Sequence, residues 1–386
     1  MLGLISRMNF DRRVREFGAD YRSKGFSSWD QFVSMLFCQM AQAKSLREIC
    51  GGLKICLGKL VHLGVGRTPS KSNLSYANRN RPWELYEAVF HDLLKTCRGS
   101  VPWNRRKFRF KNKLYSLDAT LIELCLGMYD WAKYRTTKGA VKLHMLLDHD
   151  IYMPTFVNMT DGMTHEVNVA RLLRLPPDSI VAMDMGYNDY GMFHDWTAKG
   201  IWFVTRQKDN ARFRVVAKNK LPVGKKHVLS DEMIEFVGFY AQKDCPGRLR
   251  RIVFWNEEKC EEMVFLTNNM KLAASTIAAI YKERWQIEIF FKMLKQNLKV
   301  KTFVGTSANA VKIQIWTALI ALLLIKYLQF RSRFGWSMSN LVAILRWNLF
   351  SYRELWGWLD DPFEKPPEQE YKQEELPLWD SIMGKT

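Results

Sequence analysis

The chain has 386 residues, of which 47% are hydrophobic and 25% charged, a composition that excludes an intrinsically disordered protein. Its length is too great for one ordinary core, so two or three structural units are expected. Lysine and arginine total 58 against 39 aspartate and glutamate residues, and the formal charge of +19 favours a polyanionic partner. Nucleic acid is the first candidate and an anionic membrane surface the second.

The most apolar segment, residues 311–330, argues against a membrane. Its apolar run from Ile315 to Ile325 is well short of the ~20 residues that a bilayer requires, so a buried helix is expected. The first residues lack the hydrophobic region of a signal peptide. Seven cysteines without a CxxC pair indicate reduced thiols. These features predict a cytoplasmic protein that makes no membrane contact.

Residues 9 to about 98 are predicted to be helical, because serine caps and apolar residues at helical spacing recur up to Gly51 and again after Pro82. The stretch 67–81 between these two runs has four cations and no acid, together with hydroxyl and amide side chains that donate to phosphate oxygens. It is either a solvated basic surface or a DNA contact. The four cations are Arg67, Lys71, Arg79 and Arg81.

Strand patterns begin near residue 111. Three early strands, the last two joined by a hairpin turn, are followed by alternating strand and helix patterns, which predicts a mixed α/β sheet. A strand-rich insertion interrupts this pattern before helices resume and continue to about residue 330. The acidic end of the chain is expected to be a solvated tail. The predicted strands of the sheet are 113–124, 140–150, 152–161, 178–184 and 200–206, and the insertion is 207–268.

Residues 280–300 predict one helix with two stripes. The first stripe is apolar and can pack on a sheet. The second places a single acid, Glu288, among aromatic and basic side chains that a DNA backbone would complement. Two ordinary surface salt bridges, from Arg284 and Lys292 to Glu288, would explain the same pattern. The apolar stripe contains Ile280, Ile287, Phe291, Leu294 and Leu298, and the polar stripe contains Tyr281, Arg284, Glu288, Lys292, Lys295 and Lys299.

Two further carboxylates lie where strands should place them at a site. Asp118 lies within the first strand, and Asp184 ends the buried run IVAMD, at the carboxyl end of a strand where α/β sheets commonly build sites. A capping role for the following helix would also explain Asp184. Together with Glu288, these carboxylates are suitable ligands for two Mg²⁺ or Mn²⁺ ions that catalyse phosphoryl transfer.

The pattern Tyr281-x2-Arg284-x3-Glu288-x6-Lys295 resembles the YREK signature of the IS-four-like insertion-sequence transposases. The motifs LDAT around Asp118 and AMDMGYND around Asp184 are similar to the two aspartate motifs of that family, in the expected order. The resemblance covers residues 111 to about 330.

The resemblance implies an RNase H-like core, in which Asp118, Asp184 and Glu288 bind two divalent metal ions. It also implies that Tyr281, Arg284 and Lys295 contact DNA phosphates, with Lys292 and Lys299 on the same stripe. Relatives cut inverted-repeat ends and proceed through hairpinned ends, which would require an aromatic residue to stack on a flipped base. Trp255 in the insertion is the candidate, although a tryptophan in a strand is more often part of a core.

The expected activity is therefore metal-dependent cutting and strand transfer on double-stranded DNA by a homodimer, in a bacterial, nucleoid-associated protein. A nuclease or resolvase on a similar core and a non-catalytic DNA-binding regulator are the alternatives. The expected domains are a helical DNA-end-binding domain at 1–110, a catalytic core at 111–206 and 269–330 interrupted by the insertion at 207–268, and C-terminal helices with the acidic tail at 331–386.

Overall fold

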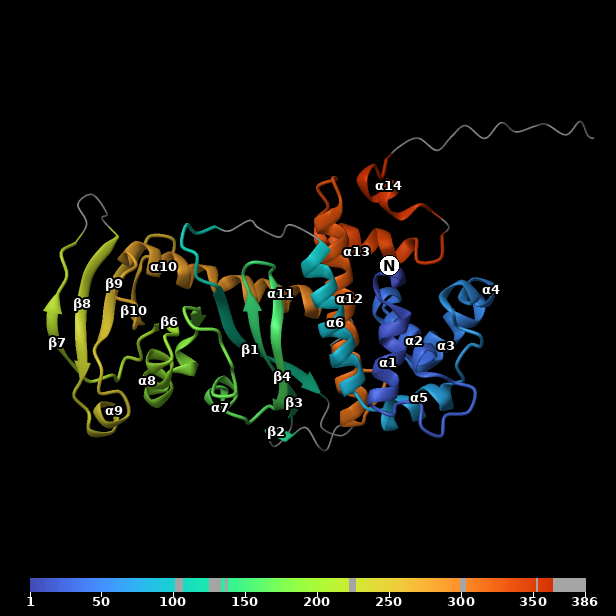
Figure 1. Cartoon of the computed structure of the whole chain (residues 1–386), viewed down its shortest axis with the longest axis horizontal. Helices are drawn as coiled ribbons and strands as arrows, with labels where there is room; N and C mark the ends of the chain where they lie inside the picture. Colours follow the sequence, from blue (N-terminus) through green and yellow to red (C-terminus); the bar gives the residue numbers. More distant parts are fainter. Residues whose placement is uncertain are drawn as a thin grey trace, which may run out of the picture.

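The computed structural model describes residues 1–100, 107–124, 133–135, 138–221, 227–298, 303–351 and 353–363. Lys299 and the acidic tail beyond residue 363, both named in the predictions from sequence, lie outside these residues. In Figure 1, the sheet and its covering helices lie on the left of the molecule, and a group of helices lies on the right.

The described strands form one ten-stranded mixed sheet. Strands β4, β3 and β1 are antiparallel neighbours, whereas β1, β5 and β6 are parallel neighbours. This arrangement confirms the predicted RNase H-like mixed sheet. The strands of this part are β1 (Leu114–Leu124), β2 (Lys133–Arg135), β3 (Lys138–Asp148), β4 (Met153–Asp161), β5 (Ile180–Met183) and β6 (Trp202–Arg206).

The predicted strand-rich insertion continues the same sheet. Its last strand pairs antiparallel with β6, with Phe265 opposite Arg206, and the other three follow outward in reverse chain order. Because these strands share the ladder of the core, the insertion is an extension of the sheet and does not form a sheet of its own. Its elements are β7 (Phe213–Lys218), β8 (Val228–Phe236), α9 (Phe239–Asp244), β9 (Leu249–Asn256) and β10 (Glu261–Thr267).

Helices cover both faces of the sheet, as Figure 1 shows. Successive strand residues point to opposite faces. Leu117 and Met183 accordingly pack in the cluster that contains α8, while Leu114 and Ile180 pack in the cluster that contains α10. The helices of this part are α7 (Glu166–Ala170), α8 (Tyr190–Ala198), α10 (Ala274–Glu283) and α11 (Trp285–Asn297), with the short 3₁₀ turn η3 (Met185–Tyr187).

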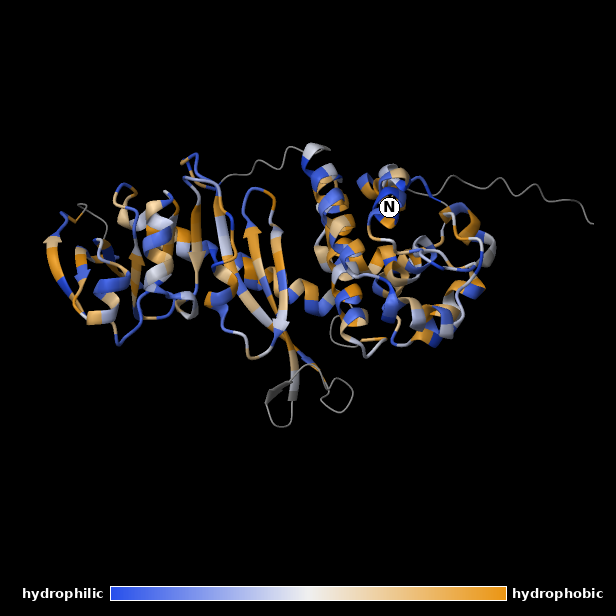
Figure 2. Cartoon of the chain, turned by 60° about the horizontal axis from the view of Figure 1, so that its bottom comes forward, coloured by the Kyte–Doolittle hydropathy of each residue, from blue (hydrophilic) through white to orange (hydrophobic). Residues whose placement is uncertain are grey.

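The remaining helices form a second group, in which α12 (Ala308–Arg331) contacts α2, α5, α6 and α13. This helix is long and apolar enough to cross a membrane, but 83% of its most apolar window is buried inside the protein, which makes it a core helix, as predicted. In Figure 2 the strands and the central helices are rich in hydrophobic residues, whereas many connecting loops are hydrophilic. The other elements are η1 (Leu2–Leu4), α1 (Arg7–Glu16), α2 (Ser28–Ala41), α3 (Leu46–Ile55), α4 (Leu57–Leu60), η2 (Val61–Leu63), α5 (Lys71–Asn80), α6 (Glu84–Ser100), α13 (Met338–Trp347) and α14 (Leu355–Asp360).

The prediction of one helix through residues 280–300 was wrong. Two helices, α10 and α11, meet at Arg284, whose backbone N–H donates to the carbonyl of Tyr281 at 3.1 Å, a three-residue turn that changes the helical hydrogen-bond register. The apolar stripe is nevertheless buried in full: each of its residues, Ile280, Ile287, Phe291, Leu294 and Leu298, is at most 5% exposed.

Candidate active site

Asp118 lies on β1 and Asp184 directly follows the neighbouring parallel strand β5. The register pairs Leu117 of β1 with Met183, the last residue of β5, so each aspartate is the next residue along its chain segment. Neighbouring strands are about 4.8 Å apart. By the alternation of the strands, both aspartates share the face of Leu114 and Ile180, which is the face that α10 covers. The sheet therefore presents two carboxylates side by side on this face.

Asp184 occupies the cap position of η3, but its side chain makes no capping hydrogen bond. Only its backbone carbonyl takes part in the turn, accepting from the N–H of Tyr187 at 3.0 Å. The alternative explanation of Asp184 as a helix cap therefore does not account for its carboxylate.

Glu288 approaches the same face from α11, which packs against β1. The guanidinium of Arg284 lies between it and the first aspartate: Nη1 donates to Asp118 Oδ2 at 2.9 Å and Nη2 donates to Glu288 Oε1 at 2.7 Å. The side chain of Arg284 is only 13% exposed. The salt bridge to Glu288 that the sequence suggested is therefore present, but it is part of a cluster with a strand carboxylate rather than an isolated surface pair.

The carboxylates of this cluster act on one another electrostatically. Burial raises the pKa of Asp118 to about 6, with further contributions from the charges of Asp184 and Glu288, although Arg284 and the N–H of Ala119 oppose this shift. Burial also raises the pKa of Tyr281, and the charge of Asp184 adds to this effect. A bound cation would offset the effect of these neighbouring charges on Asp118.

The donor set fits a hard divalent cation, because all three side chains offer carboxylate oxygens. As the side chains stand, no three acidic, histidine or cysteine residues of the described ranges are gathered closely enough to hold a metal ion. Two of the three carboxylates are instead turned toward Arg284, whose Nε is buried without a hydrogen-bond partner in the described structure. Asp118 and Glu288 already converge on one positive charge, and the guanidinium supplies it.

The structure brings Lys295 to the same interface, where its Nζ donates to Thr120 Oγ1 at 2.7 Å. Tyr281 is only 7% exposed, and its ring packs against Phe265 with centroids 5.0 Å apart. The guanidinium carbon of Arg284 lies 5.5 Å from the ring centroid of Tyr281. Lys292 is exposed on α11. The four residues of the YREK pattern therefore lie along one side of the sheet.

The four basic residues predicted at 67–81 have different surroundings. Arg67, Lys71 and Arg79 are exposed on or beside α5. Arg81 is buried, however, and its guanidinium donates to the carbonyls of Ser27 at 2.9 Å and of Phe26, and to Ser23 Oγ at 2.8 Å. The donors of Arg81 join the start of α2 to the end of α5, which favours a structural role over the predicted DNA contact.

The predicted stacking residue, Trp255, lies on β9, three strands away from β5 in the sheet order, and is 36% exposed. At strand spacing this is about 14 Å to the side of Asp184. Trp285, which the sequence reasoning missed, directly follows Arg284 and is 57% exposed. Its position directly after the arginine of the YREK signature could have identified Trp285 as a candidate from the sequence. An exposed indole next to the carboxylate cluster is a second candidate for contact with a base.

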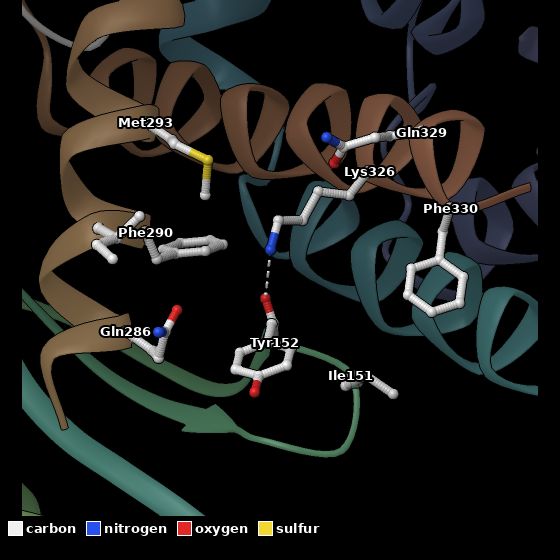
Figure 3. Close-up of a pocket in the computed structure, with 9 residues that line it drawn as sticks. Ile151, Tyr152, Gln286, Phe290, Met293, Lys326, Gln329 and Phe330 are labelled. Carbon is white, nitrogen blue, oxygen red and sulfur yellow. Dashed lines mark hydrogen bonds between the residues drawn. The ribbon is translucent and has the colours of Figure 1, made fainter. Parts of the chain in front are cut away.

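A cavity of about 260 Å³ lies beside α11, between this helix, the turn before β4 and the end of α12 (Figure 3). Lys326 points into it and its Nζ donates to the carbonyl of Tyr152 at 3.0 Å. Burial lowers the pKa of this lysine to about 8. Gln286, Phe290 and Met293 of α11 line the cavity, whereas Glu288 does not. The cavity is therefore separate from the carboxylate cluster.

Two family models match parts of this chain. Residues 109–324 match the family model described as Transposase DDE domain, and residues 1–66 match one described as Domain of unknown function (DUF4372). The first match includes β1, β5 and α11, which carry the three carboxylates.

Several relatives are named as transposases. The chain is 28% identical over 302 residues to y4zB of Sinorhizobium fredii, covering 78% of this chain and 82% of that protein. It is 27% identical over 259 residues to the transposase of insertion sequence element IS5377 from Geobacillus stearothermophilus, covering 67% of each. Transposase InsG of insertion sequence element IS4 from Escherichia coli is 23% identical over 162 residues, covering 39% of this chain and 35% of that protein. Among solved structures, a piggyBac transposase synaptic complex with hairpin DNA aligns at a TM-score of 0.45 and 11% identity, covering 96% of this chain and 82% of that chain.

Proposed function

The chain belongs to the DDE transposase family, with relatives among the insertion-sequence transposases, and from this premise we propose that it cuts DNA at the inverted-repeat ends of an insertion sequence and transfers the cut strands. The observation that carries the proposal is that the three carboxylates lie in one region on the face of the sheet that α10 covers, where two of them share a guanidinium. Asp118 of β1 lies beside Asp184 at the end of β5, and Asp118 shares the guanidinium of Arg284 with Glu288.

A DDE domain implies dependence on a divalent metal ion. We assign Asp118, Asp184 and Glu288 as its ligands and propose two ions, Mg²⁺ or Mn²⁺. When bound, such ions activate the attacking oxygen and stabilise the leaving oxygen of a phosphodiester. Partial burial of Asp118 and Arg284 lowers the local dielectric constant, which strengthens the electrostatic interactions that would hold the ions and the scissile phosphate.

We assign the cations of the polar stripe to the DNA backbone. Arg284, Lys292 and Lys295 lie on or beside the helix that carries Glu288, so a strand held by them passes over the carboxylates. The hydroxyl of Tyr281 and the ammonium of Lys299 belong to the same proposed set. Neutralising phosphates in this way fixes the position of the strand without reading its sequence.

Residues 1–110, whose described part contains α1 to α6, are proposed to bind the DNA ends through the exposed Arg67, Lys71 and Arg79. We propose the catalytic core as residues 111–206 and 269–330, with the extension at 207–268 and the C-terminal region at 331–386. Joining two ends requires two copies of the site, so a homodimer is the proposed assembly, acting on the nucleoid in the bacterial cytoplasm. A hairpin intermediate would need a flipped base to stack on Trp255 or Trp285.

The test is an excision assay on a plasmid that carries the DNA flanking the gene, with Mg²⁺, comparing the wild type with Glu288→Gln. Specific double-strand cuts at both flanks, lost in the variant while binding of the ends is kept, are expected. Binding without cuts in both proteins would replace the proposal with a non-catalytic regulator. Cuts scattered without regard to the flanks would replace it with a nuclease.

A further inference from the structure

The guanidinium of Arg284 lies where the carboxylates would hold a metal ion. It bonds one oxygen of Asp118 and one of Glu288, at 2.9 Å and 2.7 Å, and so neutralises two of the three carboxylates. A guanidinium has five N–H donors in a fixed planar arrangement. The Nε donor of Arg284 is buried and unpartnered in the described structure, which is a costly arrangement. The position is electrostatically favourable but incompletely hydrogen-bonded.

The place of Arg284 in the chain lets its side chain move without unfolding either helix. Its backbone is the junction between α10 and α11, and the guanidinium is at the end of a side chain with several rotatable bonds. Rotation of these bonds would free Asp118 and Glu288 together. The departing guanidinium would need another anion, and a DNA phosphate offers two oxygens that match its geometry.

We propose that Arg284 competes with the divalent metal ion for Asp118 and Glu288, and that a DNA phosphate relieves this competition by binding the guanidinium. The proposal rests on the function proposed above, because it takes these carboxylates as metal ligands and DNA as the substrate. In the protein without DNA, Arg284 keeps metal affinity low. With DNA bound, the carboxylates are released to the metal.

This competition makes the two ligands cooperative. If DNA raises the affinity for the metal by some factor, the metal raises the affinity for DNA by the same factor. Coupling of this kind typically amounts to ~5–150-fold. The consequence is that the site binds the metal ion chiefly when a DNA strand is bound.

A purely structural role for Arg284 predicts the opposite change in metal affinity when the guanidinium is removed. If the guanidinium only holds Asp118 and Glu288 in position for a metal ion, its removal leaves two carboxylates less well ordered and weakens metal binding. Competition instead predicts that its removal strengthens metal binding. The direction of the change therefore distinguishes the two roles.

The experiment titrates Mn²⁺ into the full chain without DNA and measures bound ion by electron paramagnetic resonance. Arg284→Met is expected to bind Mn²⁺ about tenfold more tightly than the wild type. Arg206→Met is the matched control, because Arg206 is near enough to influence Tyr281 electrostatically but has no hydrogen bond or salt bridge to Asp118 or Glu288 within the described residues. Its effect is expected to stay within about twofold, as for a charge screened by solvent. Unchanged or weaker binding in Arg284→Met, with a melting curve showing that it is folded, would overturn the proposal.

A second titration adds a duplex that stops at the proposed cleavage site. This pre-cut DNA carries the inverted-repeat end and has no bond left to cleave. In the wild type this DNA is expected to tighten Mn²⁺ binding at least fivefold, and in Arg284→Met to change it by less than about twofold. If DNA changes Mn²⁺ affinity equally in both proteins, the proposal that a DNA phosphate binds Arg284 and frees the carboxylates is overturned. Loss of Mn²⁺ binding in Glu288→Gln shows that the measured ion is bound at this site. Because the first titration needs no DNA and no cleavage, competition can be established even if the excision assay fails.

Discussion

Lys295 donates a hydrogen bond to Thr120 across the interface of α11 and β1, with Nζ and Oγ1 2.7 Å apart. Thr120 is two residues after Asp118 on the same strand, so the two side chains share one face of the sheet. The bond fixes the ammonium next to the carboxylate cluster. This placement makes Lys295 a candidate for direct contact with the phosphate that is cut.

Lys295→Ala is expected to weaken DNA binding and to reduce the slope of log affinity against log salt by about one, because one phosphate contact is lost. Binding measured by fluorescence anisotropy over a range of salt concentrations gives the slope. Thr120→Val is the control, since it removes the partner of Lys295 and keeps the charge. A salt slope that Lys295→Ala leaves unchanged would assign Lys295 to a structural pair with Thr120.

Asp184→Asn is expected to abolish strand cleavage with little loss of stability, because its side chain makes no capping bond in the structure. Asp189→Asn is a matched control five residues later. Asp189 Oδ1 caps α8 by accepting from the N–H of Met192 at 2.7 Å, and asparagine caps equally well. Cleavage at wild-type rate in Asp184→Asn would remove Asp184 from the mechanism.

Arg81→Met is expected to lower the free energy of unfolding by roughly 3 kcal/mol, because two buried carbonyls and Ser23 lose their donor. Arg79→Met removes a neighbouring exposed charge and should change stability by less than about 0.5 kcal/mol while weakening DNA binding. Urea denaturation of both variants measures the free energy of unfolding, and a titration with DNA measures their DNA affinity. Equal stability of the two variants would contradict the structural role of Arg81.

Lys326→Met is expected to stabilise the protein at pH 7 by roughly 1–2 kcal/mol, because Lys326 forms no salt bridge within the described residues and burial of its ammonium costs more than its bond to the Tyr152 carbonyl returns. In the folded wild type, this lysine has a pKa of about 8, below the unfolded model value of 10.5. Between these values the unfolded state binds more protons, so wild-type stability rises with pH through this group. The advantage of the variant should therefore shrink between pH 8 and pH 10.

Thermal melts at pH 7, 8, 9 and 10 measure this difference. Lys312→Met, at the other end of the same helix, is the control, since Lys312 lies over the ring of Trp83 rather than in the cavity. A gap between Lys326→Met and the wild type that stays constant across this pH range would show that the ammonium is not penalised by burial.

The sequence by itself determined the types and order of the elements, because strand and helix periodicities are local properties of the chain. The strands at 114–124, 153–161 and 180–183 lie where alternation or apolar runs predicted them, and the apolar stripe predicted from Ile280 to Leu298 is buried. The signature also selected Glu288 and the two aspartates as candidates, since those residues stand in recognisable local motifs. The roles assigned to them remain predictions that the variants above test.

Only the tertiary structure decided which of these residues meet. The parallel register of β1 and β5 makes Asp118 and Asp184 neighbours across 66 residues of sequence, and the break at Arg284 changes the helical hydrogen-bond register where its guanidinium reaches both Asp118 and Glu288. Burial of Arg81 and continuation of the core sheet by β10 depend on contacts with distant segments. Periodicity reports which face of an element is apolar, but pairing between elements depends on long-range packing, which a local pattern does not encode.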